Sequence, residues 1–293
     1  MDPISSKLTS NNINISRGLI LPVYTNDPGD GNPGEIIYVN GQLKYYREGK
    51  WLFITDGKKD GLTEATAVDK STDILVANPS APSGWYWIKT NNVARQYWVD
   101  NTYDGGGWVL VGSHPINVSI QALTYAQAAE SYSGNASSTY GTGDPKSYSV
   151  WVGLNGWDAI ATANAAGRNF VYYTANSQVS LGSTASHVRR SRWKWSGWNS
   201  LYSWNNANTL INEVGASTPG LWYYHMSYNF TTYDRDQDAY SANCATLYNN
   251  APWWYGACWD GNFWGGNGSG YANAAFWTGS GGDYYNYGAM YVK

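Results

Sequence analysis

Three aspartates alternate in one short segment of the chain, at Asp234, Asp236 and Asp238. Carboxylates this close together at neutral pH need either a cation between them or wide exposure to water. The spacing excludes an EF-hand, since Ala239 replaces the turn glycine at position six and Ala245 replaces the bidentate glutamate at position twelve. Two interpretations remain: a loop that binds calcium weakly, with a Kd of roughly 10⁻⁴–10⁻³ M, and a solvated acidic turn.

The only two cysteines, Cys244 and Cys258, follow the aspartates and are separated by 14 positions. They are either two buried thiols or a disulfide. A disulfide would close a short loop, contribute roughly 3 kcal/mol by chain entropy, and require an oxidising environment. Trp253 and Trp254 lie between the cysteines, and indole faces suit stacking on sugars. The whole segment is therefore predicted to be a binding site.

Recognised catalytic motifs are absent from the sequence. It contains no His-Glu-x-x-His, no Gly-x-Ser-x-Gly and no phosphate-binding glycine loop. The three histidines have no cysteine or carboxylate at metal-ligand spacing. Asp234 and Asp260 could hydrolyse a glycoside if they were held roughly 5–9.5 Å apart, but a cation would keep Asp234 ionised. We expect a binding protein rather than an enzyme.

The composition narrows the range of partners. Net charge is −3 and charged residues make up 13 % of the chain, against about 25 % in ordinary domains, so nucleic acid and anionic membranes are not expected partners. No apolar run approaches the roughly 18 residues of a membrane span. The 17 Trp and 26 Tyr against 5 Phe suit half-wet binding surfaces, although we expect most of these rings to pack structurally.

A series of landmarks resembles the fibrinogen-like C-terminal domain, found in fibrinogen chains, ficolins and related lectins. They occur in the family's order: an opening strand at 83–88, Tyr-Trp-Val-Asp at 97–100, three glycines before a tryptophan at 104–109, the approach to the aspartates at 230–233, Asn-Cys-Ala at 243–245 and a closing strand within 276–293. The resemblance covers roughly residues 80–293. It implies an α+β fold with a twisted antiparallel sheet, short helices and long loops.

The resemblance also implies a set of calcium ligands. By position, these are the carboxylates of Asp236 and Asp238 and the backbone carbonyls of Tyr240 and Ala242. Asp234 would act through water or behind the direct ligands. The cofactor expected from this resemblance is Ca²⁺.

The family pattern further implies a Cys244–Cys258 disulfide and a cis peptide bond at 257–258, which is costly without proline. Two departures from the pattern are visible. Val99 stands where a cysteine is usual, and Trp259 replaces the histidine that commonly follows the second cysteine in lectin members. The acetyl-group preference of the animal lectins is therefore not assumed for this chain.

We expect a carbohydrate ligand, with aromatic faces stacked on its C–H surfaces and polar side chains fixing its hydroxyl groups. The predicted contacts are Trp253, Trp254, Trp259, Asp260, Asn262, Phe263, Tyr271 and Trp277.

The front of the chain is predicted to have its own organisation. Residues 1–34 have no hydrophobic period and are interpreted as an extended arm. Residues 35–57 contain three short alternating strands and the hairpin signal Asn40-Gly41, which indicates a small β-meander that needs a partner to cover it. Residues 58–79 are interpreted as a linker that is possibly helical, and 80–293 as the fibrinogen-like domain.

Within the front, 18–51 is loosely similar to short modules of bacteriophage fibre and virion proteins, and the sequence starts with no recognisable signal peptide. The leading hypothesis is therefore a virion fibre or spike whose calcium-stabilised head binds host surface glycans. Its expected partners are itself, as a homotrimer, and other virion proteins contacted through 1–57. The alternatives are a head or neck decoration protein without a ligand, and a secreted animal lectin.

Overall fold

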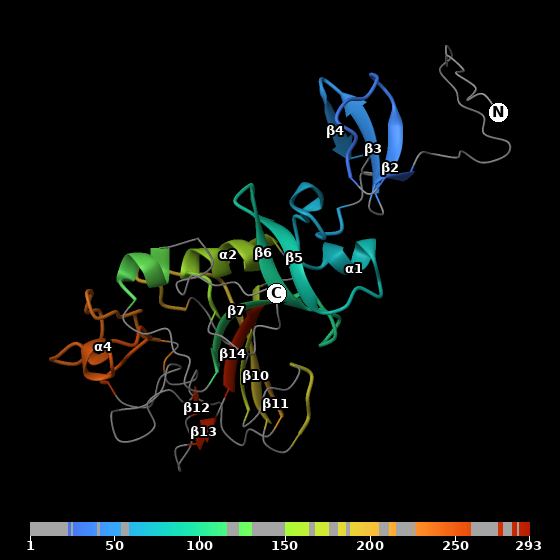
Figure 1. Cartoon of the computed structure of the whole chain (residues 1–293). Coiled ribbons are helices and arrows are strands. Elements are labelled where there is room, and N and C mark those ends of the chain that lie inside the picture. The colour runs from blue at the N-terminus through green and yellow to red at the C-terminus, as the bar shows by residue number, and fades with distance from the viewer. Residues whose placement is uncertain are drawn as a thin grey trace, which may run out of the picture. The chain divides into compact units, whose positions relative to one another are not determined.

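A computed structural model of the chain describes residues 23–24, 26–39, 42–53, 59–115, 123–130, 150–163, 168–175, 181–185, 188–204, 211–214, 225, 227–258, 275–277, 283–285 and 287–293. The chain divides into two compact units, 1–58 and 59–293 (Figure 1). Among the helices in these ranges, none is both long and apolar enough to cross a bilayer.

The first unit is a four-stranded sheet. Three of its strands, β2 (Ile36–Val39), β3 (Gln42–Arg47) and β4 (Lys50–Phe53), form the antiparallel meander that the alternating pattern predicts. The arm differs from its prediction, because β1 (Val23–Tyr24) pairs in parallel with β2. The reason is local packing beyond the strands: the Trp51 indole donates a hydrogen bond to the carbonyl of Pro28 at 2.8 Å and so holds the arm against the sheet.

The second unit begins at Lys59, so the structure also differs from the linker expected over 58–79. This segment forms a short 3-10 helix, η1 (Glu64–Thr66), and a helical turn, α1 (Asp73–Ala77). Val68 and Ile74 are fully buried, and Val68 bridges Ile88 in parallel. The segment is therefore part of the folded unit, held by separate contacts of short turns, and only parts of it are helical.

An eight-stranded, mainly antiparallel sheet forms the centre of this unit, in the order β11-β10-β9-β14-β7-β6-β5 with β8 paired to β7. Its strands are β5 (Gly84–Thr90), β6 (Val93–Asp100), β7 (Trp108–Pro115), β8 (Val150–Trp151), β9 (Arg168–Ala175), β10 (Val188–Trp195), β11 (Ile211–Val214) and β14 (Tyr287–Val292). A separate pair is formed by β12 (Ala275–Trp277) and β13 (Asp283–Tyr285).

Besides η1 and α1, the described residues of this unit include a single π-helical turn, η2 (Ala126–Glu130), the ten-residue α2 (Leu154–Ala163) and the short α4 (Cys244–Leu247). The sheet and these helices confirm the predicted α+β class. The largest fully buried side chains are mostly indoles: Trp108, Trp151, Trp157, Trp193, Trp253 and Trp254. Among the Trp and Tyr side chains that the structure describes, most are therefore buried in the core.

Candidate functional site

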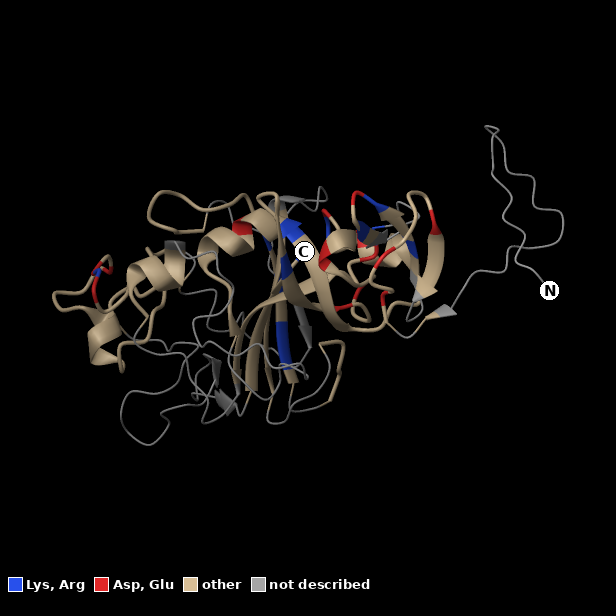
Figure 2. Cartoon of the chain, turned by 45° about the horizontal axis from the view of Figure 1, so that its top comes forward, with Lys and Arg blue, Asp and Glu red and all other residues tan. Residues whose placement is uncertain are grey.

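The aspartate loop, residues 234–245, lies at the α4 end of the second unit, where Figure 2 shows a small group of acidic and basic residues apart from the other charges of that unit. Two backbone bridges hold its base, one between Thr231 and Trp253 and one between Thr232 and Arg235. Asn243 caps α4, since its side-chain oxygen accepts from the Thr246 N–H at 3.1 Å. The loop is therefore held in place by specific contacts and is not simply a solvated acidic turn.

Asp238 is the organising carboxylate of the loop. One of its oxygens accepts from the backbone N–H of Tyr240 and the other from that of Cys244, both at 2.9 Å. Burial raises the pKa of Asp238, these two N–H donors oppose that rise, and the like charge of Asp236 adds to it. The two carboxylates therefore repel each other in a partly desolvated position, where a cation would relieve the repulsion.

The oxygen ligands that this loop offers suit a hard cation, although few of them are charged. Within the described ranges, no group of three or more His, Cys, Asp or Glu side chains is placed to share a metal. Asp236 and Asp238 would supply two carboxylates, and the remaining ligands would be backbone oxygens, for which Tyr240 and Ala242 stay predictions. Oxygen ligands of this kind are those that calcium uses, and a small charge count suits weak affinity.

Asp234 has a different role from its two neighbours. One of its carboxylate oxygens accepts from the Thr232 hydroxyl at 2.7 Å and from the Tyr125 backbone N–H at 2.9 Å. The guanidinium of Arg235 lies over the Tyr125 ring, 4.0 Å from its centroid. Asp234 therefore connects the loop to a segment 109 positions earlier, instead of joining the carboxylate pair.

The disulfide between Cys244 and Cys258 is present, with the two Cα atoms 5.0 Å apart, which confirms that prediction. The expected cis peptide bond at 257–258 is not found, since no peptide bond in the described part is cis. The chain instead reverses through Cys258 itself, whose φ is +69°. A left-handed residue turns the backbone where the family pattern implied a cis bond.

The predicted aromatic platform is only partly described. Trp253 and Trp254 are fully buried, so their role as sugar-stacking residues is corrected to a structural one. The Trp254 ring stacks on Trp198 at 5.7 Å, and its indole N–H donates to the Tyr202 carbonyl at 2.6 Å. The side chains of Trp259, Asp260, Asn262, Phe263, Tyr271 and Trp277 lie outside the described residues, although the Trp277 backbone is part of β12.

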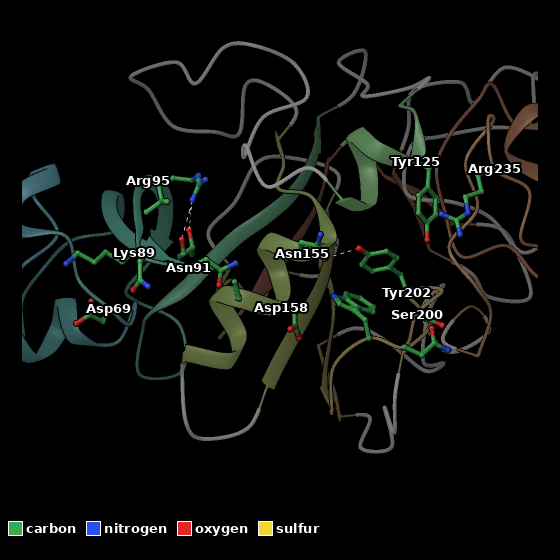
Figure 3. Close-up of a pocket in the computed structure, with 16 residues that line it drawn as sticks. Asp69, Lys89, Asn91, Arg95, Tyr125, Asn155, Asp158, Ser200, Tyr202 and Arg235 are labelled. Carbon is green, nitrogen blue, oxygen red and sulfur yellow. Dashed lines mark hydrogen bonds between the residues drawn. The ribbon is translucent and has the colours of Figure 1, made fainter.

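A cleft of about 1260 Å³ opens beside the aspartate loop (Figure 3). It is built from the β5–β6 turn, the first half of α2, residues 198–202, Tyr125 and Arg235. Sequence reasoning missed this cleft because its lining comes from segments far apart in the chain. The one local signal was Asn91-Asn92, whose φ values of +49° and +63° form the tight turn between β5 and β6.

The cleft wall is tied to the core. The Trp198 indole N–H donates to the Leu154 carbonyl at 3.1 Å, and the Tyr202 hydroxyl donates to the Asn155 side chain at 2.8 Å. Tyr202 has a φ of +55°, a strained conformation of the kind often found at ligand sites. The aromatic residues here are therefore held in place before any ligand arrives.

Comparison with known proteins places this fold. Angiopoietin-related protein 2 of mouse and of human are each 25 % identical over 185 residues, which is 60 % of this chain and 31 % of each relative. The chain thus spans about a third of the length of these relatives. The solved fibrinogen-like globe domain of human ANGPTL6 has a TM-score of 0.55 at 21 % identity and covers 77 % of this chain and 95 % of that one. For the globe domain of human ANGPTL2, the TM-score is 0.54 at 22 % identity, with 77 % and 98 % covered.

These relatives correct the expected location. They are animal proteins and not virion proteins, so the predicted virion location is wrong, and nothing in these relatives supports a fibre, spike or decoration role. The similarity of 18–51 to bacteriophage modules is likewise unsupported. That similarity rested on a few turn and strand residues, which recur in many small β-meanders because they encode only local geometry.

The remaining comparison concerns the family as a whole. The family model described as "Fibrinogen beta and gamma chains, C-terminal globular domain" matches residues 69–292. The match begins directly after the buried Val68, and so includes half of the segment first interpreted as a linker. The opening strand, the triple glycine and the aspartate loop all fall within it. Residues 69–292 cover most of the chain, which therefore belongs to the family of fibrinogen C-terminal globular domains.

Proposed function

We propose that this chain is a non-catalytic recognition module that binds carbohydrate outside the cell, with calcium stabilising its aspartate loop. The observation that carries the proposal is the pairing of Asp236 and Asp238 in a loop closed by the Cys244–Cys258 disulfide. A disulfide is kept in an oxidising compartment, and such compartments hold enough calcium for a weak site of the expected range.

Calcium would act here as a structural ion. When bound, it would neutralise the two carboxylates, which otherwise repel each other. Asp238 holds the N–H groups of Tyr240 and Cys244, so the loop backbone and the first cysteine are positioned by the same side chain. The residues after Cys258, which include the predicted contacts Trp259 and Asp260, are attached to this arrangement through the disulfide. The predicted homotrimer stays a separate proposal.

The calcium part is tested by stability. For a Kd of roughly 10⁻⁴–10⁻³ M, calcium at about 10 mM should stabilise the fold by about 1.4–2.7 kcal/mol. Asp236→Asn and Asp238→Asn should each lose most of this gain. Glu64→Gln is the matched control, because it removes one exposed carboxylate far from the loop in sequence. If calcium stabilised the unmodified chain and the three variants equally, calcium binding at this loop would be refuted.

The recognition part is tested by binding. The full chain should bind a subset of a glycan array in calcium, and EDTA should reduce that binding. Binding that chelation leaves unchanged would separate the two halves of the proposal and keep only carbohydrate recognition. A chain that is folded and calcium-loaded but binds no glycan would overturn the carbohydrate assignment.

A further inference from the structure

The cleft of Figure 3 is a second surface to which the proposed function assigns no role. Its volume of about 1260 Å³ exceeds the roughly 300–1,000 Å³ of ordinary small-molecule sites. Figure 3 shows Arg95 at one end and Arg235 at the other, with Asn155 and Tyr202 between them. Its size and elongated lining suit a chain-like ligand better than a single small molecule.

Positive charge predominates in the lining. The charged side chains that face the cleft are Lys89, Arg95, Arg235, Asp69 and Asp158. Asp69 forms an ion pair with Lys59, which balances its charge from outside this set. The lining therefore carries three cationic and two acidic side chains, and one of the two acidic ones, Asp69, is paired with Lys59. Both ends of the cleft offer a guanidinium, so a ligand with negative groups at separate positions along its length would complement it.

The two arginines are held in place by different contacts. Arg95 donates from one guanidinium nitrogen to the carbonyl and to the hydroxyl of Thr90, at 3.3 and 3.2 Å. Arg235 stacks on Tyr125 and makes no ion pair with any carboxylate of the described ranges. Stacking leaves the N–H edge of a guanidinium available, and that planar edge matches a carboxylate or sulfate group.

Tyr125 supplies an independent sign of a missing ligand group. The residue is only 4 % exposed, yet its hydroxyl has no hydrogen-bond partner among the residues that the structure describes. Figure 3 shows it on the wall of the cleft beside Tyr202, whose ring centroid is 5.9 Å away. A buried hydroxyl without a partner is unfavourable, so a polar ligand atom at this place would satisfy it.

The remaining polar lining favours a carbohydrate over an acidic peptide. Asn91, Asn92 and Asn199 present side-chain amides, which both donate to and accept from hydroxyl groups. A bound peptide commonly adds to an open strand edge or fills apolar pockets. Here the outer side of β5 is bridged by Val68, and the lining includes few apolar side chains beyond Val93 and Ala159.

We propose that this cleft binds an acidic oligosaccharide, with Arg95 and Arg235 pairing with acid groups near its two ends and the Tyr125 hydroxyl bonding an oxygen between them. This site is separate from the calcium loop and from the predicted contacts after Cys258. It adds to the proposed function, and it stands whether or not calcium occupies the loop.

The test is calorimetric titration of the full chain with four probes in calcium buffer: a sulfated heparin hexasaccharide, a carboxylated oligogalacturonate, uncharged maltohexaose and a short polyglutamate. The two acidic saccharides should bind, and more weakly as salt is raised. Arg95→Gln and Arg235→Gln should each weaken them about tenfold, as expected for the loss of a charge-assisted hydrogen bond. Lys194→Gln, which removes an exposed charge on β10 outside the cleft, should bind like the unmodified chain.

Tyr125→Phe separates a ligand contact from a structural role. It deletes only the unpartnered hydroxyl, so the free energy of unfolding should stay the same or rise while acidic saccharide affinity falls several-fold. The proposal is overturned if neither arginine variant differs from Lys194→Gln, if maltohexaose binds as tightly as the acidic saccharides, or if polyglutamate binds more tightly than both. Loss of glycan-array binding with intact cleft binding would refute the proposed function alone.

Discussion

Gly106 is the position where the backbone geometry of the triple-glycine turn makes the sharpest prediction. Its φ is +70°, and a Cβ there would lie 2.4 Å from Leu75 Cδ1 and 2.8 Å from the Asn101 carbonyl oxygen. Asn101 cannot easily withdraw, because its backbone N–H donates to the Ser83 hydroxyl at 2.9 Å. Gly106→Ala therefore adds a steric clash to the cost of a left-handed alanine.

Gly105 provides the matched control. Its φ is +75°, but a Cβ would meet only the flexible end of Lys293, at 3.7 Å. Both substitutions carry a left-handed penalty of about 1–2 kcal/mol and the same gain from a less flexible unfolded chain. Overpacking adds about 1–3 kcal/mol at Gly106 alone. Gly106→Ala should thus be less stable than Gly105→Ala by about 1–3 kcal/mol.

Urea unfolding followed by tryptophan fluorescence measures this difference. Sixteen of the 17 tryptophans lie in 59–293, and only Trp51 lies outside, so the signal reports the unit that contains the turn. The difference between the two midpoints isolates the clash, because the backbone terms cancel. Equal destabilisation by the two alanines would refute the close packing of Leu75 and Asn101 against this turn.

Three further predictions follow from buried groups. Burial lowers the pKa of His225 from 6.5 to about 4, so on acidification the unfolded chain takes up the proton before the folded chain does. The free energy of unfolding is therefore highest above pH 6.5 and should fall by about 2 kcal/mol at pH 5. Urea midpoints that do not move between pH 7.5 and 5 would contradict this. Trp254→Ala should cost about 3–5 kcal/mol of unfolding free energy, and a stable variant that has only lost glycan affinity would restore its ligand role. Replacing both Cys244 and Cys258 by serine should lower stability by roughly 3 kcal/mol, which thermal unfolding without reductant would measure against the unmodified chain under the same conditions.

The family pattern in the sequence carried much of the domain's architecture because its landmarks are local. Glycines at positive φ before Trp108, the Asn40-Gly41 signal between two strands and the alternate aspartates each depend on residues a few positions apart. The Cys244–Cys258 pairing was likewise predictable, since no other cysteine competes. The location was not predictable, because local turn chemistry does not record the compartment in which a domain works.

The separate roles of residues in the aspartate loop depended on distant contacts. From spacing, Asp234 is equivalent to Asp236, but in the fold it accepts from Tyr125, 109 positions away. Trp253 and Trp254 have the composition of a sugar platform, yet both are enclosed in the core. An aromatic residue has the same chemistry in a core and on a binding surface, so only its surroundings distinguish the two.

The sequence by itself determined the carboxylate-rich loop through the spacing of its aspartates, and its resemblance to a family predicted the fold and the Cys244–Cys258 cross-link, because the landmarks of that family are short local motifs. Only the tertiary structure decided that Asp234 ties the loop to Tyr125 and that the Trp253 and Trp254 indoles are buried away from a ligand. It also decided that Arg95, Tyr125 and Arg235 line one cleft. Those outcomes depend on long-range packing, in which segments separated by more than a hundred residues meet, and no local pattern specifies that meeting.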